Sequence, residues 1–223
     1  MGADGTGIGR RPWSVALAAA LGGLLWVPYG VFEMLQPWGE DTVYRDDRGY
    51  EVVTDTLLYW VYSLPGSLAL LLTTLGLLGA LDLLRLPTAR ISRIGLILAY
   101  VALGLAILSA VGVVTRFDPL FTGPRIFGTL ALGGATVLMG VAAHRMGTAP
   151  GWAATLLALG LLGLFLLPLW PLVYAVNLVP EGGGTGIIAL FGLGWVMVGY
   201  QPWRSQRQKL IGNARNTGLR ETR

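Results

Sequence analysis

Long apolar runs separated by short polar segments dominate the pattern of this 223-residue chain. A helix needs about 20 consecutive apolar residues to cross a hydrocarbon core about 30 Å thick. Six runs meet or approach this length, at residues 15–35, 57–84, 94–114, 126–143, 152–176 and 186–200. The sequence therefore predicts an all-α integral membrane protein: a six-helix transmembrane bundle over residues 1–203, followed by a basic tail over 204–223.

The composition supports this class and excludes others. Hydrophobic residues make up 54% of the chain and charged residues only 13%, whereas soluble domains carry about 25% charged residues. A soluble enzyme, a disordered protein and a nucleic-acid-binding module are therefore excluded as the main interpretation. The chain has no cysteine and one histidine, His144, so thiolate chemistry and multi-histidine metal sites are excluded, and no cofactor is expected.

The distribution of basic residues predicts the orientation. Cytoplasmic loops of membrane proteins carry an excess of Lys and Arg. With the N-terminus inside, the outer loops hold only four of the basic residues, Arg45, Arg48, Arg116 and Arg125. The largest outer loop, 36–56, is rich in acidic residues, and a solvated loop with local ion pairs is expected there. Both termini are therefore expected in the cytoplasm of a cell whose plasma membrane the protein spans. The predominance of Arg over Lys, with 33 Gly, suggests a bacterial source.

The first apolar run has a second interpretation. Arg10 and Arg11 precede it, as a basic pair precedes a twin-arginine export signal. The run continues past Ala20 to Leu35, which is longer than the 7–15 apolar residues of a cleaved signal. An uncleaved first helix is therefore favoured over a removed signal peptide.

Ionisable residues inside the apolar runs are candidates for function, because burying a charge in a membrane is unfavourable. Glu33, Asp82 and His144 lie in or beside the runs, and all are near helix ends rather than at the midplane. This weighs against a transporter built on a central carboxylate. Asp82 is expected to pair with Arg85. The sequence carries no nucleophile elbow, metalloprotease motif or phosphate loop, so an enzyme is disfavoured and no catalytic or metal-binding residue is assigned.

Glu33 is the centre of a candidate ligand-binding pocket at the outer end of the bundle. Its predicted neighbours at similar depth are Tyr29, Tyr59, Tyr62, Trp170, Tyr174 and Asn177. Prolines 28, 65, 168 and 171 lie in the same zone and are expected to bend the helices. A carboxylate there would suit a cationic or hydroxyl-bearing ligand. In the alternative, Glu33 reaches the headgroups and pairs with an outer arginine, while the aromatic residues form an interfacial belt.

Small residues recur at helical spacing, as in Ala102, Ala106 and Ala110. They predict close packing of helices, either within the chain or between copies. The tail residues Arg204, Arg207 and Lys209 are expected to contact anionic lipid at the inner membrane surface, and nucleic-acid binding is not expected.

The sequence thus favours a non-enzymatic module: a subunit, a regulator or a ligand- or lipid-binding protein. Its candidate partners are the lipid bilayer, another membrane protein or a second copy of the chain. A small transporter or permease is the alternative. The polar side chains that it would use at depth are Thr73, Thr74, Ser109, Thr129, Thr136 and Thr155.

Overall fold

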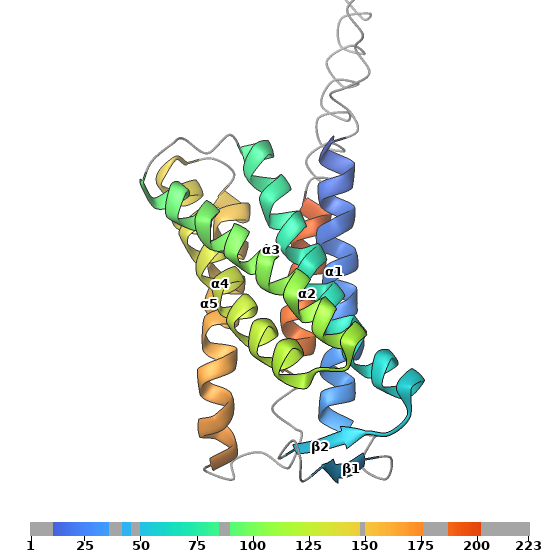
Figure 1. The fold of residues 1–223 in the computed structure, drawn as a ribbon. Helices are drawn as coiled ribbons and strands as arrows, with labels where there is room; N and C mark the ends of the chain where they lie inside the picture. Colours follow the sequence, from blue (N-terminus) through green and yellow to red (C-terminus); the bar gives the residue numbers. More distant parts are fainter. Residues whose placement is uncertain are drawn as a thin grey trace, which may run out of the picture.

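The structure is a computed structural model that describes residues 11–35, 42–45, 50–84, 90–147, 150–175 and 187–201. Its labelled elements are α1 (Arg11–Leu35), β1 (Thr42–Arg45), β2 (Tyr50–Val53), α2 (Thr56–Leu84), α3 (Arg90–Thr115), α4 (Asp118–Arg145) and α5 (Pro150–Ala175). A further apolar helix covers Ile187–Gln201. Figure 1 shows the helices lying side by side in one bundle, with the two strands beyond one end, where α1 ends and α2 begins.

The predicted helical bundle is confirmed in the described residues, but several boundaries differ from the predicted ones. Helix α1 begins at Arg11 and α3 at Arg90, four residues earlier than the apolar runs. Helix α4 begins at Asp118, eight residues before the predicted start, and has a proline in its first two positions. Proline suits the first turn of a helix, where its missing N–H is not needed. Polar residues therefore extend these helices beyond their apolar stretches.

The outer loop contains a β-hairpin that the sequence analysis missed. Strands β1 and β2 pair antiparallel, with Thr42 opposite Val53 and Arg45 opposite Tyr50. Valine, threonine and tyrosine favour strands, and the intervening sequence Asp46-Asp47-Arg48-Gly49 has the composition of a turn. Two segments of the loop 36–56, which was predicted only as a solvated loop, thus form strands, because the acidic composition masked a short strand pattern.

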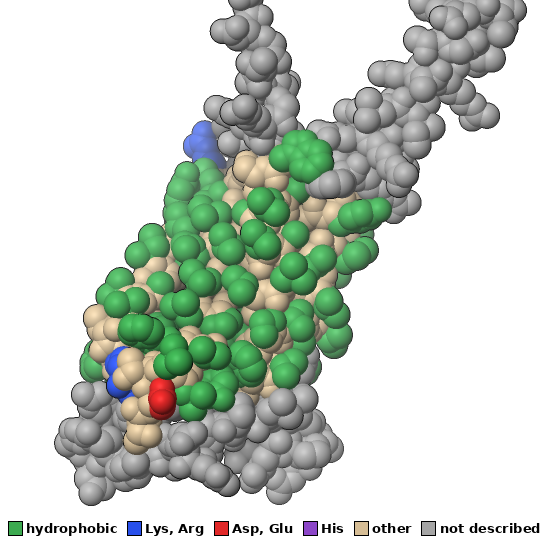
Figure 2. Space-filling model, turned by 90° about the vertical axis from the view of Figure 1, so that its right-hand side faces the viewer, with side chains coloured by type: hydrophobic (Ala, Val, Ile, Leu, Met, Phe, Trp, Pro, Cys, Tyr) green, Lys and Arg blue, Asp and Glu red, His purple; other side chains and the backbone are tan. Residues whose placement is uncertain are grey.

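Four helices are long and apolar enough to cross a membrane. The candidate spans are Trp13–Phe32, Thr56–Leu81, Arg90–Thr115 and Pro119–Arg145. Helix α3 exposes a continuous apolar face, including Ile97 at 61% and Tyr100 at 58% of their surface. Figure 2 shows hydrophobic side chains covering the middle of one face, with charged side chains only near the two ends of its described part. This distribution indicates a membrane protein.

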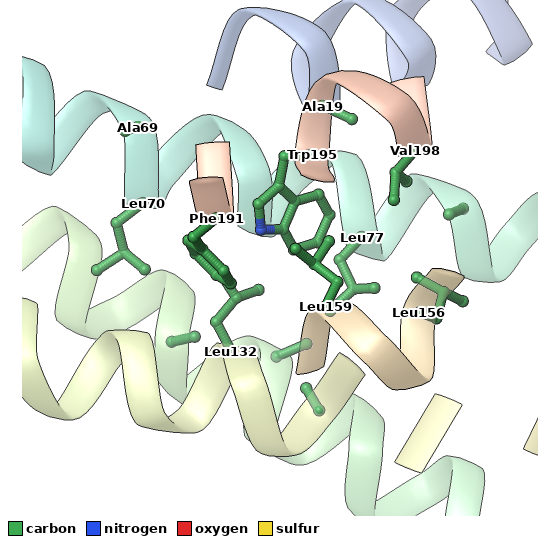
Figure 3. Packing of buried hydrophobic residues seen from close by; sticks show 14 of the residues in the cluster. Ala19, Ala69, Leu70, Leu77, Leu132, Leu156, Leu159, Phe191, Trp195 and Val198 are labelled. Atoms are coloured by element: carbon green, nitrogen blue, oxygen red, sulfur yellow. The ribbon is translucent and has the colours of Figure 1, made fainter. Parts of the chain in front are cut away.

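The core of the bundle is built around the last described helix, Ile187–Gln201. Phe191 and Trp195 of this helix are 1% and 0% exposed and belong to the largest hydrophobic cluster. In Figure 3 they project between Leu70 and Leu77 of α2, Leu132 of α4 and Leu159 of α5. The helix therefore joins elements from both halves of the chain.

Small residues bring the helices close together. The buried face of α3 consists almost entirely of Ser, Gly and Ala: Ser92, Gly95, Ala99, Ala102, Ala106, Ser109 and Gly112, with Val113 beside them. A Cβ added to Gly160 of α5 would lie 2.5 Å from the backbone nitrogen of Val137 in α4. Ala102 and Ala106 are fully buried, and Ala110 is partly buried. The small residues predicted to mediate helix packing thus pack within this chain, as expected for helices in lipid.

Candidate functional site

Arg125 lies within a candidate membrane span, although the sequence analysis placed it in an outer loop. It belongs to α4, and the candidate span on that helix, defined by length and composition, covers Pro119–Arg145. Six residues at 1.5 Å per residue put Arg125 about 9 Å along the helix axis from Pro119. The loop assignment is wrong because the apolar run begins only after Arg125, whereas the helix begins at Asp118.

The guanidinium of Arg125 is stacked between aromatic rings of two helices. Its central carbon lies 4.7 Å from the ring centroid of Tyr29 in α1 and 4.2 Å from that of Phe121 in α4. Tyr29 is itself 4% exposed, and its ring is so close to Gly66 of α2 that a Cβ on Gly66 would lie 2.9 Å from it. Cation–π contacts are worth up to about 2 kcal/mol each when desolvated. The stack therefore fixes a positive charge between α1 and α4.

A second arginine, Arg116, occupies the tight turn between α3 and α4. The Phe117 N–H donates to the Gly112 carbonyl at 2.9 Å, and the Arg116 N–H to the Val113 carbonyl at 3.2 Å. This pair of bonds defines a Schellman C-cap, whose left-handed residue is usually glycine. Arg116 has φ of 54°, which costs about 1 kcal/mol or more for a residue with a Cβ.

The side chain of Arg116 holds the turn against the start of α2. Its Nη1 donates to the Thr56 hydroxyl at 2.8 Å, and its guanidinium carbon lies 5.5 Å from the Tyr59 ring centroid. Tyr59 contacts Phe121 edge to face, with centroids 6.4 Å apart. Tyr29, Tyr59, Arg116, Phe121 and Arg125 thus form one connected group, which we name the arginine–aromatic cluster.

The arginine–aromatic cluster continues into the core through aromatic contacts. Tyr29 meets Trp26 at 5.8 Å, Trp26 meets Phe191 at 5.5 Å, and Phe191 meets Trp195 at 6.3 Å, all edge to face. Within the described part of the chain, the buried indole N–H groups of Trp26 and Trp195 have no hydrogen-bond partner. An unsatisfied buried donor costs about 1–3 kcal/mol. The core therefore contains two indole donors that no described acceptor satisfies.

Buried hydroxyl groups next to the cluster connect three helices. The hydroxyl groups of Ser67 in α2 and Ser109 in α3 are 2.8 Å apart, and Ser109 also donates to the Phe121 carbonyl of α4 at 3.1 Å. Both serines are fully buried. Such interhelical bonds average about 0.6 kcal/mol in membrane proteins. They hold Phe121, and with it the cluster, in one position.

The structure describes only part of the pocket predicted from the sequence. Tyr29 and Tyr59 lie in the arginine–aromatic cluster, and Tyr62 contacts Phe32 at 5.2 Å between ring centroids. For Glu33, Trp170 and Tyr174 the structure describes the helical backbone, and their side chains lie outside the described part. Asn177 and the tail residues Arg204, Arg207 and Lys209 lie outside the described residues altogether.

Sequence reasoning missed Arg116 and Arg125 as site residues. A signal was present, because Pro119 suits the first turn of a helix that would include Arg125. The stacking could not be predicted, since it depends on how α1 packs against α4. Among the described residues, no group of three or more His, Asp or Glu side chains is placed to bind a metal ion.

The threonines proposed to line a transport path bond to their own helices. The hydroxyl of Thr73 donates to the Ala69 carbonyl, Thr74 to Leu70, Thr129 to Arg125, Thr136 to Leu132 and Thr155 to Gly151, all at 2.6–2.8 Å. This pattern satisfies the hydroxyl within one turn of helix. The hydroxyl hydrogens are therefore directed at backbone oxygens one turn earlier.

Comparisons with known proteins identify no relative that could assign a function to this site. The chain was compared with protein-family models, with curated proteins and with solved structures. None of the three comparisons yields a match, so the interpretation of the site rests on its own geometry.

Proposed function

We propose that this chain is a multi-pass plasma-membrane protein that binds a lipid or another small ligand at its outer end and does no catalysis. The observation that carries the proposal is the stacking of Arg125 between Tyr29 and Phe121 inside a candidate span. Charged residues within membrane spans are costly and mark sites of function. A guanidinium held by two rings is already ordered before a ligand arrives, so little conformational entropy is lost on binding.

A second observation supports ligand binding at this end of the core. The indole N–H of Trp26 is a buried donor without a partner among the described residues. Trp26 contacts Tyr29, which carries the Arg125 stack. A ligand with a carbonyl or phosphate oxygen could satisfy a donor of this kind and remove its desolvation penalty.

The transporter alternative has less support. A polar path needs side chains whose hydrogen-bonding groups face the transported molecule. The buried threonine hydroxyls instead donate to carbonyls of their own helices, as Thr73 and Thr136 do. No flux is therefore expected from the reconstituted protein.

Native mass spectrometry of the full-length protein, extracted gently from its own membranes, tests the proposed function. We expect the wild-type protein to retain a lipid or metabolite and the Arg125→Met variant to lose most of it. Arg93→Gln, at an exposed position near the opposite end of α3, is the matched control and should retain the ligand. A bare wild-type protein would contradict the proposal, and a retained second protein would favour a subunit or regulator. Glu33→Gln, if it changes neither retention nor thermal stability, would limit Glu33 to an interfacial role.

The six-span topology with both termini inside is part of the same proposal. Helix α5 and the Ile187–Gln201 helix are apolar and pack in the bundle with the four long spans. Most arginines would then lie at the cytoplasmic ends, as the positive-inside rule requires.

Cysteine labelling in intact cells tests this orientation, because the chain contains no cysteine of its own. Thr54 lies at the proposed outer end and His144 at the proposed inner end, and both are exposed. A membrane-impermeant maleimide should label Thr54→Cys in intact cells and His144→Cys only after lysis. The opposite labelling pattern would reverse the topology.

A further inference from the structure

Arg116, a member of the arginine–aromatic cluster, occupies a strained and tightly held position. Its φ of 54° places it in the left-handed region, where glycine is usual. Its Nη1 bonds the Thr56 hydroxyl, and its guanidinium lies over Tyr59. Strained non-glycine residues persist where surrounding contacts determine them, and they concentrate at functional sites. The side-chain contacts of Arg116 therefore hold its backbone in an unfavourable conformation.

Arg116 lies where three candidate membrane spans meet. Three candidate spans have one end near it: the first begins at Thr56, the second ends at Thr115 and the third begins at Pro119. In a membrane crossed by these three helices, the headgroups would lie near this turn. Arg125 lies on the same helix hairpin, about 9 Å along the α4 axis from Pro119 by helical rise. One guanidinium is at this turn and a second, caged by rings, adds positive potential nearby.

Apolar side chains surround Arg116 on the surface. Leu57, next to Thr56, is 70% exposed, and Val114 and Phe117, on either side of Arg116, are 64% and 51% exposed. An isolated anion from solution would gain nothing from these side chains. An amphiphile would place its charged group on the guanidinium and its acyl chains along the apolar residues. The nearby Asp55 carboxylate accepts the Leu58 N–H at 2.9 Å and so caps α2.

We infer that Arg116 and Thr56 bind the phosphate of an anionic phospholipid in the outer leaflet. The inference rests on the proposed lipid-binding function and on its orientation, and it names the ligand class. The planar guanidinium fork matches a phosphate and serves several acceptors at once. The Thr56 hydroxyl, already bonded to Nη1, adds a neighbouring polar group, and the exposed residues Leu57, Val114 and Phe117 contact the acyl chains.

Thermal unfolding of the full-length protein in nanodiscs tests this inference. The nanodiscs contain phosphatidylcholine alone or with phosphatidylglycerol, and tryptophan fluorescence reports the midpoint. Phosphatidylglycerol should raise the midpoint of the wild type and of Arg93→Gln equally. In Arg116→Asn the increase should fall to less than half, because asparagine tolerates the left-handed backbone but lacks the guanidinium. Arg116→Lys should keep part of the increase, and Thr56→Val should lose part of it.

Two outcomes would overturn the inference. An undiminished increase in Arg116→Asn would show that the lipid acts elsewhere. An equal increase from inorganic phosphate in phosphatidylcholine nanodiscs would assign the site to a soluble anion. If Arg116→Asn does not fold, the Arg116→Lys and Thr56→Val variants test the inference instead. In that case, a wild-type increase of the midpoint in both variants would overturn it.

The failure of this inference is distinguishable from failure of the proposed function. A wild-type protein that retains a ligand in native mass spectrometry, with a phosphatidylglycerol effect unchanged by Arg116→Asn, keeps the function and refutes the lipid assignment. If the wild-type protein retains nothing on extraction, but Arg116→Asn removes the phosphatidylglycerol effect, the proposed function fails and the lipid assignment is supported.

Discussion

Replacing Gly23 by alanine is expected to destabilise the protein strongly, because the added methyl group would clash with the backbone of another helix. A Cβ at Gly23 would lie 2.5 Å from the Gly192 carbonyl oxygen and 2.7 Å from the Val196 nitrogen. Both are backbone atoms of the Ile187–Gln201 helix, so a side-chain rotation cannot relieve the clash. Overpacking of a core typically costs about 1–3 kcal/mol, and we expect the upper part of this range here.

Gly104→Ala is the matched control for Gly23→Ala. Gly104 lies on the exposed face of α3, and a Cβ there would meet nothing within 4 Å. Alanine is favoured over glycine in a helix by about 1 kcal/mol, so the control should be neutral or slightly stabilised. The unfolding midpoint in a mild detergent, followed by the fluorescence of the eight tryptophans, measures both. Equal midpoints for the two variants would mean that α1 and the last helix do not approach so closely.

Arg125→Ala is expected to lower stability by about 2 kcal/mol, because it removes two cation–π contacts of roughly 1 kcal/mol each. The contacts in question join Arg125 to Tyr29 and Phe121, and hence α1 to α4. Arg125→Met should cost less than about 1 kcal/mol, since a long apolar chain refills the space between the rings and no charge has to be buried.

The contrast between the two Arg125 variants separates packing from recognition. Titration with a denaturing detergent gives the stability of each variant, and native mass spectrometry gives ligand retention. We expect Arg125→Met to fold nearly as well as the wild type while retaining little ligand. If Arg125→Ala is as stable as the wild type, the stacked geometry contributes nothing to the fold.

The helices were predictable from the sequence because each buries a long apolar run, whereas their ends were not. The apolar pattern of α2 predicted its extent to within one residue, Leu57 against Thr56, with the same end at Leu84. The start of α4 was misplaced by eight residues, since a helix that reaches the headgroups continues through Asp118 and Arg125. Hydropathy indicates whether a residue prefers water or lipid, but it does not predict whether the backbone of a polar residue is helical.

The candidate site was predictable in its location but not in its composition. Tyr29 and Tyr59 were selected from their depth, and both lie in the arginine–aromatic cluster. Arg116 does lie in the connection between two helices, as predicted, whereas Arg125 was assigned to that connection because charge was taken as a sign of solvent. Their contacts depend on helix packing: Arg125 reaches Tyr29 only because α1 and α4 converge, and no spacing in the sequence encodes that convergence.

The central position of the last described helix has a consequence for the order of events during synthesis. A ribosome delivers α1 to α5 to the membrane before residues 187–201 emerge, so α1 must wait for its Gly192 and Gly199 neighbours. During that interval Trp26 lacks Phe191, its aromatic partner from the final helix. The nascent bundle therefore has an unfilled centre for as long as translation of the final segment takes. Membrane chaperones and proteases can act on the incompletely packed bundle in this period, before Trp195 fills the core.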